Sequence, residues 1–278
     1  MRGKHISKLM TYIDIADSLE HSTFRRLAIG AWGKPRDPKV YTKVKCEISA
    51  FLELKNSKLD YKFITITHFF TKVMGELVKH YPELNCTLIR NKLYYRKSVS
   101  AFIHTHIRTR KGYDLMGVTV EGVDKLSVSD ICNVILDESK NIRAKKNKEL
   151  TKSARVIRYI PLFAIKFFVG ILDFLFYTCN LKVIGMPKDM YGSYAITTVG
   201  GLGFEEAFVP LFPFSRLGLV LAIGKPFEEY VFDGKAHQKC HFVNLCFTMD
   251  HRFFDGAHFA KPLRLLKKLV KNPELVIF

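Results

Sequence analysis

Segments with helical spacing of apolar residues alternate along this chain with strand-like segments, and this feature constrains its fold most. Residues 63–80 place apolar side chains three and four positions apart, and the Tyr81-Pro82 pair ends the helix that this spacing predicts. Residues 93–110 and 114–122 are rich in β-branched and aromatic residues, which is typical of strands. The pattern predicts a protein of the α/β class.

The second half of the chain continues this pattern. Residues 125–146 are amphipathic at helical spacing, and Ser127 or Ser129 is expected to cap that helix. Residues 217–250 predict three strands, with a hairpin between the second and the third. Because no long linker, internal repeat or low-complexity tract interrupts the chain, we expect one domain over residues 1–278.

The charge balance restricts the partners that we expect. Basic residues give a formal net charge of +18 and are spread along the whole chain, which favours an anionic partner such as nucleotide phosphates or anionic lipid. No Walker-type loop, zinc-finger spacing or basic-aromatic motif accompanies this charge, so we expect no nucleic-acid binding. The six cysteines are scattered, which predicts reduced, mostly buried thiols. Charged residues interrupt the N-terminal stretch where a signal peptide would be apolar, so a cytoplasmic location is expected.

One apolar segment differs from this globular pattern. The segment from Ile157 to Tyr177 is long enough to cross a bilayer as a helix, and basic residues from Arg143 to Arg158 precede it. Lys166 and Asp173 would lie on one face of that helix and would each cost roughly 3 kcal/mol at the bilayer centre. A spanning helix therefore fits poorly. Two alternatives stay open: a helix in the membrane surface, which gives peripheral membrane association, or one buried in the core or between subunits.

Residues 251–256, with the sequence His-Arg-Phe-Phe-Asp-Gly, follow an alternating strand directly. Such a turn holds an imidazole at the end of a rigid strand, and histidine is the side chain best suited to take a proton near neutral pH. Taken alone, the six residues favour a simpler interpretation, in which His251 and Asp255 form a local ion pair in a loop.

Two further patterns are weaker. His104 and His106 point to one face of a strand, but no third ligand accompanies them, so a polar strand face is preferred and no metal is expected. The glycine-rich residues 200–203 lack the strand, turn, helix and later acidic residue of a dinucleotide site. We expect a turn there.

Residues 250–257, Asp-His-Arg-Phe-Phe-Asp-Gly-Ala, resemble the DHRxxDGA signature of the acyltransferase core of 2-oxo-acid dehydrogenase complexes, a relative of chloramphenicol acetyltransferase. Residues 63–85 resemble the early helix of that family and its Pro-x-x-Asn turn, and residues 114–135 resemble its strand-then-helix segment. Residues 193–226 resemble its strand, glycine turn and proline-marked loop, and the terminal Asn-Pro-Glu-Leu resembles its closing motif. Together these segments cover most of the chain from residue 63 onward, in the order of the family.

The resemblance implies a two-layer α/β sandwich with a mixed β-sheet, chloramphenicol acetyltransferase-like, that assembles as a homotrimer or a higher assembly of trimers. It also implies an active site in a channel between neighbouring subunits, where coenzyme A (as the acyl-CoA co-substrate) and the acyl acceptor enter from opposite sides. His251 matches the general base of the family, and Asp255 matches an acid that orients the site through a salt bridge.

Thr197 matches the hydroxyl residue that donates to the oxyanion of the tetrahedral intermediate in a neighbouring subunit. The alternative is that Thr197 and Thr198 are ordinary β-branched strand residues. For the arginine partner of Asp255, Arg25 and Arg26 lie near the expected region but out of register.

The chain also departs from the family pattern. Complex-forming members carry a lipoyl domain and a subunit-binding domain, for which the residues before the catalytic segments leave no room, so we expect a stand-alone form without an acceptor tethered in cis. The apolar segment at about 157–177 resembles an insertion, which could meet lipid, a greasy substrate or another subunit.

The function that follows is a CoA-dependent acyltransferase that moves an acyl group between CoA and a small-molecule or lipid-like acceptor by direct attack. Two alternatives stay open: acylation in trans of a lipoyl group on a separate protein, and a non-catalytic trimeric scaffold or membrane-docking module, because a fold does not fix a function.

Overall fold

The computed structural model describes eight stretches of the chain, which are residues 38–57, 61–89, 92–109, 112–143, 162–181, 189–212, 215–232 and 234–277. Contacts among Cα atoms group residues 38–278 into one compact unit. The expected single domain over residues 1–278 reaches beyond the described residues and stays a prediction.

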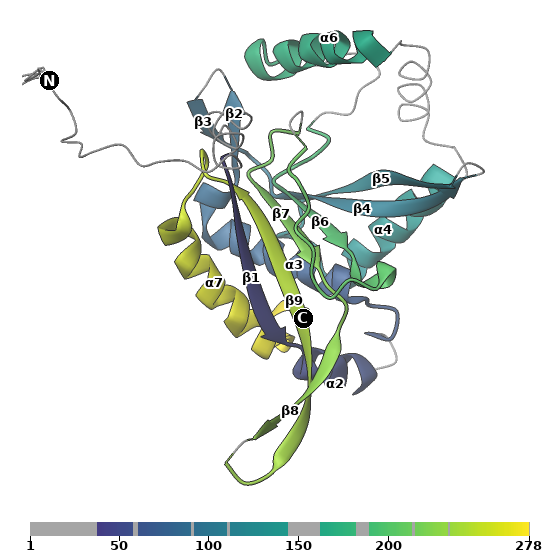
Figure 1. Ribbon diagram of the computed structural model, residues 1–278, viewed down its shortest axis with the longest axis vertical. Helices are drawn as coiled ribbons and strands as arrows, with labels where there is room; N and C mark the ends of the chain where they lie inside the picture. The colour runs from purple at the N-terminus through teal and green to yellow at the C-terminus, as the bar shows by residue number, and fades with distance from the viewer. Residues whose placement is uncertain are drawn as a thin grey trace, which may run out of the picture. The chain divides into compact units, whose positions relative to one another are not determined.

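A mixed β-sheet forms one layer of the fold (Figure 1). Its strands are β1 (Lys39–Glu47), β4 (Ser100–Thr109), β5 (Gly112–Glu121), β6 (Tyr194–Thr198), β7 (Leu219–Ile223), β8 (Phe227–Phe232) and β9 (His237–Asp250). Their order is β1-β9-β7-β6-β4-β5, and β8 also pairs with β9. The β4/β6 and β6/β7 pairs are parallel and the other pairs are antiparallel, so the predicted mixed sheet is confirmed.

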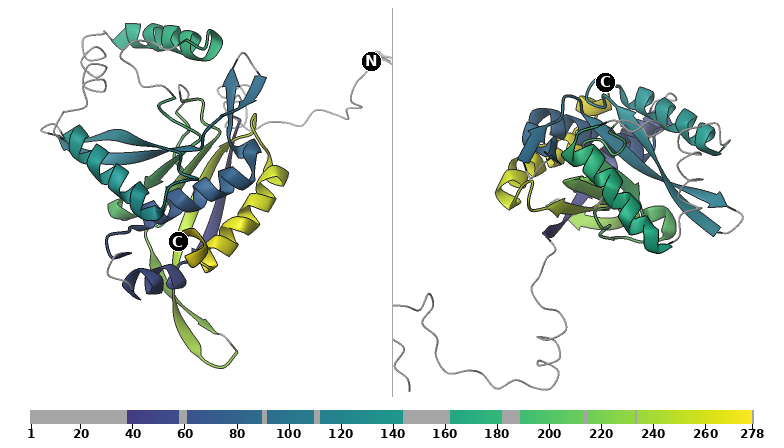
Figure 2. Two further views of the ribbon diagram at one scale, coloured as in Figure 1. Left: turned by 180° about the vertical axis from the view of Figure 1, so that it is seen from behind. Right: turned by 90° about the horizontal axis from the view of Figure 1, so that it is seen from above.

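Helices cover one face of this sheet, as the left view of Figure 2 shows. They are α2 (Ser49–Ser57), α3 (Ile66–His80), α4 (Val128–Arg143) and α7 (Gly256–Lys271), and the short α8 (Glu274–Ile277) packs against α3. Alternate strand residues, among them Ile196, Leu221 and Phe247, belong to the main core between sheet and helices. The predicted two-layer α/β sandwich is therefore confirmed.

Residues between these core positions face the other side of the sheet. There Phe102, Ala195 and Val220 form a smaller apolar cluster with Leu211 and Leu217. The latter two come from the segment between β6 and β7, which begins with the 3-10 turn η4 (Gly200–Leu202). The glycine-rich residues thus form the turn expected from the sequence.

Local hydrogen bonds explain where two helices begin. Thr65 caps α3 in a capping box with His68, and the Ser127 hydroxyl accepts from the Asp130 backbone N–H at 3.1 Å at the start of α4. Ser127 is therefore the cap of α4, and the alternative Ser129 lies inside the helix.

Residues 93–110, whose composition is typical of strands, contribute to two strands in different sheets. Their first part forms β3 (Lys92–Tyr95), which pairs with β2 (Cys86–Ile89) in a separate two-stranded sheet after the 3-10 turn η2 (Pro82–Leu84). Their second part is β4 of the main sheet.

The apolar segment is helical where it is described. It forms α6 (Leu162–Asp173), followed by a π-helical turn, η3 (Phe174–Thr178), while residues 157–161 lie outside the described residues. Among the helices that the structure describes, none is long and apolar enough to cross a membrane.

Candidate active site

A clamped turn connects β9 to α7. The buried Asp250 ends β9. Its carboxylate accepts hydrogen bonds from Nε (3.0 Å) and Nη2 (2.6 Å) of Arg252 and from the Arg252 backbone N–H (2.9 Å). The Asp250 backbone N–H donates to the Gly218 carbonyl at 2.9 Å. A two-point guanidinium–carboxylate pair fixes orientation as well as distance, so the start of the turn is rigid.

Two aromatic rings hold the middle of the turn. Phe253 and Phe254 are buried in the main core. A Cβ at Gly218 would lie 3.0 Å from the ring of Phe253 and 3.2 Å from that of Phe254, so the missing side chain of Gly218 makes room for both rings.

Asp255 closes the turn as the N-cap of α7. Its Oδ1 accepts the backbone N–H groups of Ala257 (2.9 Å) and His258 (3.1 Å), and it lies 2.8 Å from Nδ1 of His258. These hydrogen bonds, above all the one from the His258 backbone, hold the pKa of the exposed Asp255 carboxyl below its usual range. Since the carboxylate pairs with His258, a local ion pair between His251 and Asp255 is not formed.

His251 is the polar side chain of this turn that has no partner among the described residues. It is exposed, and its backbone N–H donates to the Pro38 carbonyl at 2.8 Å, beside the start of β1. Its imidazole makes no hydrogen bond or ion pair to the residues that the structure describes. A rigid turn thus presents a free imidazole to solvent.

Thr197 and Thr198 differ in what they contact. The Thr198 hydroxyl lies 2.7 Å from that of Thr67 on α3, so it joins the sheet to a helix. Thr197 points to the other face, is 6% exposed, and has no hydroxyl hydrogen bond within the described part of the chain. Of the two residues, Thr197 is therefore the one whose hydroxyl is available to a ligand.

Within one chain, Thr197 and His251 are far apart. Thr197 pairs with Ala222, and Ala222 pairs with Cys246. His251 lies five residues beyond Cys246 along the chain. With about 3.4 Å per residue and about 4.8 Å between strands, the two residues are roughly 19 Å apart. They cannot act on one carbonyl group in the same copy.

The other predicted residues contribute no site in the described structure. The ring of His104 packs edge-on against Phe102, and its Nδ1 lies 3.4 Å from the Ile196 carbonyl. The side chain of His106 and the whole of Arg25 and Arg26 lie outside the described residues. The described residues include no group of three or more His, Cys, Asp or Glu side chains placed to hold a metal ion.

The family model of the 2-oxoacid dehydrogenases acyltransferase catalytic domain matches residues 33–173 and 186–278. The chain belongs to this acyltransferase family. The interruption of the match falls at the end of the apolar segment, just after α6.

Relatives of this acyltransferase domain agree with that assignment. The dihydrolipoyllysine-residue acetyltransferase component of the acetoin cleaving system of Bacillus subtilis (strain 168) is 22% identical over 77% of the chain. The chain spans 43% of the length of that protein.

Solved structures share the fold. A probable dihydrolipoamide acetyltransferase from Listeria monocytogenes superposes with a TM-score of 0.63 at 16% identity, over 92% of this chain and 95% of that one. The dihydrolipoamide acetyltransferase of Azotobacter vinelandii gives 0.63 at 18% identity over 100% of both chains. That structure was used to investigate a serine, a histidine and an asparagine in catalysis.

Sequence reasoning identified His251 in this acyltransferase domain but missed what holds it. The Asp250–Arg252 clamp and the space at Gly218 were not predicted. The two-residue spacing of Asp250 and Arg252 is the only local signal for the clamp, whereas the contact between Gly218 and the turn requires the register of β7 against β9.

Proposed function

We propose that this protein is a CoA-dependent acyltransferase whose general base is His251. The observation that carries the proposal is the turn itself, in which Asp250, Arg252, Phe253, Phe254 and Asp255 each have a structural partner. His251 alone is left exposed and unpaired within the described structure. Rigid presentation of a free imidazole suits proton transfer at neutral pH.

The reaction is direct attack of the acceptor on the thioester of acyl-CoA. His251 takes the proton from the attacking thiol or hydroxyl as the new bond to the carbonyl carbon forms. The carbonyl oxygen becomes an oxyanion, towards which the Thr197 hydroxyl donates a hydrogen bond. The carbon–sulfur bond of the thioester then breaks, and the His251 proton passes to the departing CoA thiolate. No covalent enzyme intermediate is needed.

The catalytic groups of one site come from two copies of the chain. A separation of roughly 19 Å within one copy exceeds the reach of Thr197 and His251 towards a shared carbonyl group. A neighbouring copy must supply the hydroxyl, and the closed symmetry that this exchange requires fits a homotrimer.

Asp255 positions the turn that carries His251. In the Azotobacter enzyme, the investigated histidine and asparagine are four positions apart, the same separation as His251 and Asp255 in this chain. Here an acid stands at the second position and caps α7, so its role is to hold the turn that carries His251. Asp255 transfers no proton in this mechanism.

The donor and the acceptor follow from chemistry and from the named relatives. A formal net charge of +18 suits the phosphates of CoA. The Bacillus relative is named for acetyl transfer to a dihydrolipoyl-lysine residue, which favours a lipoyl group on a separate protein as a second candidate beside a small-molecule or lipid-like acceptor.

The test is a panel of acyl-CoA thioesters, each incubated with free dihydrolipoamide and with other acceptors while CoA release is followed. The proposal expects at least one acyl-CoA to turn over and to raise the melting temperature, because a ligand bound only by the folded state stabilises it. Turnover with dihydrolipoamide assigns the lipoyl acceptor. No shift and no CoA release with any thioester would contradict the proposal and favour a non-catalytic scaffold.

A further inference from the structure

An apolar stripe runs along α6 and η3. Phe167, Ile171 and Phe174 are 74%, 43% and 56% exposed, respectively. Their spacing of four and three places them on one face of the helix, and Gly170 between them is exposed as well. Together the three side chains form an apolar stripe that is exposed in the single chain. Exposed apolar patches on a folded protein mark surfaces that contact a partner or a membrane.

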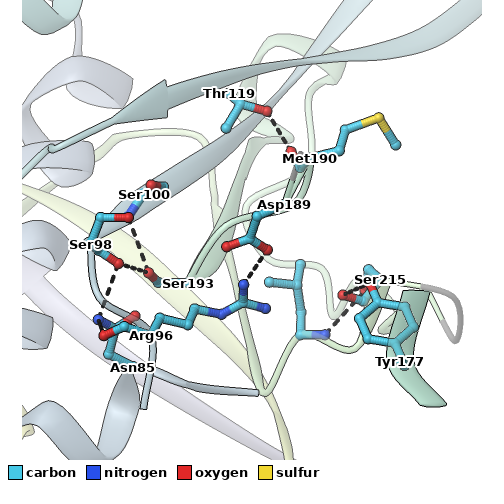
Figure 3. Close-up of polar contacts among 11 residues, drawn as sticks. Asn85, Arg96, Ser98, Ser100, Thr119, Tyr177, Asp189, Met190, Ser193 and Ser215 are labelled. Atoms are coloured by element: carbon cyan, nitrogen blue, oxygen red, sulfur yellow. Dashed lines mark hydrogen bonds and ion pairs between the residues drawn. The ribbon is translucent and has the colours of Figure 1, made fainter. Parts of the chain in front are cut away.

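A different face of the same segment is attached to the protein by polar contacts. The Asp173 carboxylate accepts hydrogen bonds from Nε (3.1 Å) and Nη2 (2.5 Å) of Arg216. The Arg216 guanidinium lies 5.4 Å from the centre of the Tyr177 ring. The Tyr177 hydroxyl donates to the Ser215 carbonyl at 3.2 Å (Figure 3).

These contacts fix which way the apolar stripe faces. The carboxylate of Asp173 is turned towards the protein and is already neutralised by Arg216, so it adds no charge to the outward surface. The objection that an acidic residue interrupts the apolar segment therefore does not apply to a helix lying in a membrane surface.

The chain next to this segment is strongly basic. Residues 143–158 contain seven lysines and arginines and one glutamate, and three residues separate their end from the start of α6. Basic residues close in sequence to an apolar helical face are a combination that binds anionic lipid.

We propose that α6 and η3 dock the protein on an anionic lipid surface, with Phe167, Ile171 and Phe174 inserted among the acyl chains. The segment lies in the plane of the interface and does not cross it. The proposal is independent of the catalytic assignment, because it uses none of the residues of the β9–α7 turn.

Flotation of the full chain with vesicles tests this. The protein should float with vesicles of equal parts phosphatidylglycerol and phosphatidylcholine, float less as salt is added, and float poorly with phosphatidylcholine alone. The triple variant Phe167→Ser, Ile171→Ser, Phe174→Ser should lower the fraction bound at least about tenfold. A matched control, Tyr230→Ser with Phe232→Ser, removes exposed aromatic rings from the β8–β9 hairpin and should float like the wild type.

A second measurement does not depend on the folding of the triple variant. Trp32 is the one tryptophan of the chain, so a Phe167→Trp variant with Trp32→Phe reports from the stripe alone. Its emission should shift to the blue when the anionic vesicles are added. The proposal is overturned if the wild type does not float, if the triple variant floats like the wild type, or if the emission does not move. A triple variant that changes oligomeric state while the wild type ignores vesicles would show that a second copy covers the stripe, and this too overturns it.

Discussion

Two variants that are each inactive should restore activity when they assemble together. His251→Ala removes the proposed base, which typically costs about two to four orders of magnitude in rate. Thr197→Val keeps the shape of the side chain but removes the hydroxyl, and loss of an oxyanion donor costs about two to three orders of magnitude. Because the two residues lie roughly 19 Å apart in one copy, each site needs a base and a hydroxyl from different copies.

The expected recovery follows from the geometry of a ring. In a trimer that contains both variants, one of the three contacts joins an intact His251 to an intact Thr197, whichever variant is present twice. Trimers selected for both variants should therefore show about one third of the wild-type rate. The two variants would be co-expressed with different affinity tags, purified on both tags, and assayed for CoA release.

Recovery near one third, against less than about one hundredth for either variant alone, would support a site shared between copies. Mixed trimers that stay as inactive as their parents would refute it, provided that their sizing profile matches the wild type. The control is a double variant that carries His251→Ala and Thr197→Val in the same chain. Trimers of this variant contain neither catalytic group and should stay inactive.

Three further changes test the packing that positions the site. Burial lowers the pKa of His68 to about 4, and its Nδ1 accepts from the Thr65 N–H. The contribution of His68 to the free energy of unfolding is therefore fully present above about pH 6.5 and falls by up to roughly 3 kcal/mol as the pH drops towards 4. In denaturant unfolding, His68→Gln should make the free energy of unfolding depend less on pH over this range. An unchanged pH dependence would contradict the assignment. Asp255→Ala should lower the melting temperature more than Asp255→Asn, which keeps a capping oxygen, and equal losses would exclude the cap as its role. Gly218→Ala forces a Cβ against the Phe253 ring and should cost about 1 to 3 kcal/mol and slow catalysis; a fully stable, fully active variant would show that the turn tolerates the shift.

The sequence predicted the class of fold because its periodic segments are long. Residues 63–80 and 125–146 predicted two helices, the end of the first from Pro82 and the cap of the second from Ser127 or Ser129, whereas the Thr65 cap of the first was missed. Shorter elements were missed. β1 and α2 carry a weak periodic signal, and nothing local in residues 93–110 shows that the chain leaves one sheet for another between β3 and β4.

The site was predicted through a resemblance, and its geometry was not. Spacing alone favoured a pair between His251 and Asp255, whereas in the structure Asp255 caps α7 and His251 has no side-chain partner in the part of the chain that the structure describes. Likewise, the sequence of the apolar segment could not choose an exposed face. That choice depends on Asp173 meeting Arg216, 43 residues further along the chain.

The most direct measurement is the rate of acyl transfer from acyl-CoA by the wild type and by His251→Ala, with His251→Gln as a variant that keeps a polar side chain of similar size. Both variants should lose about two to four orders of magnitude in rate while melting temperature and assembly stay unchanged, because the imidazole has no structural partner among the described residues. A variant that keeps the wild-type rate would contradict the assignment of His251 as the base.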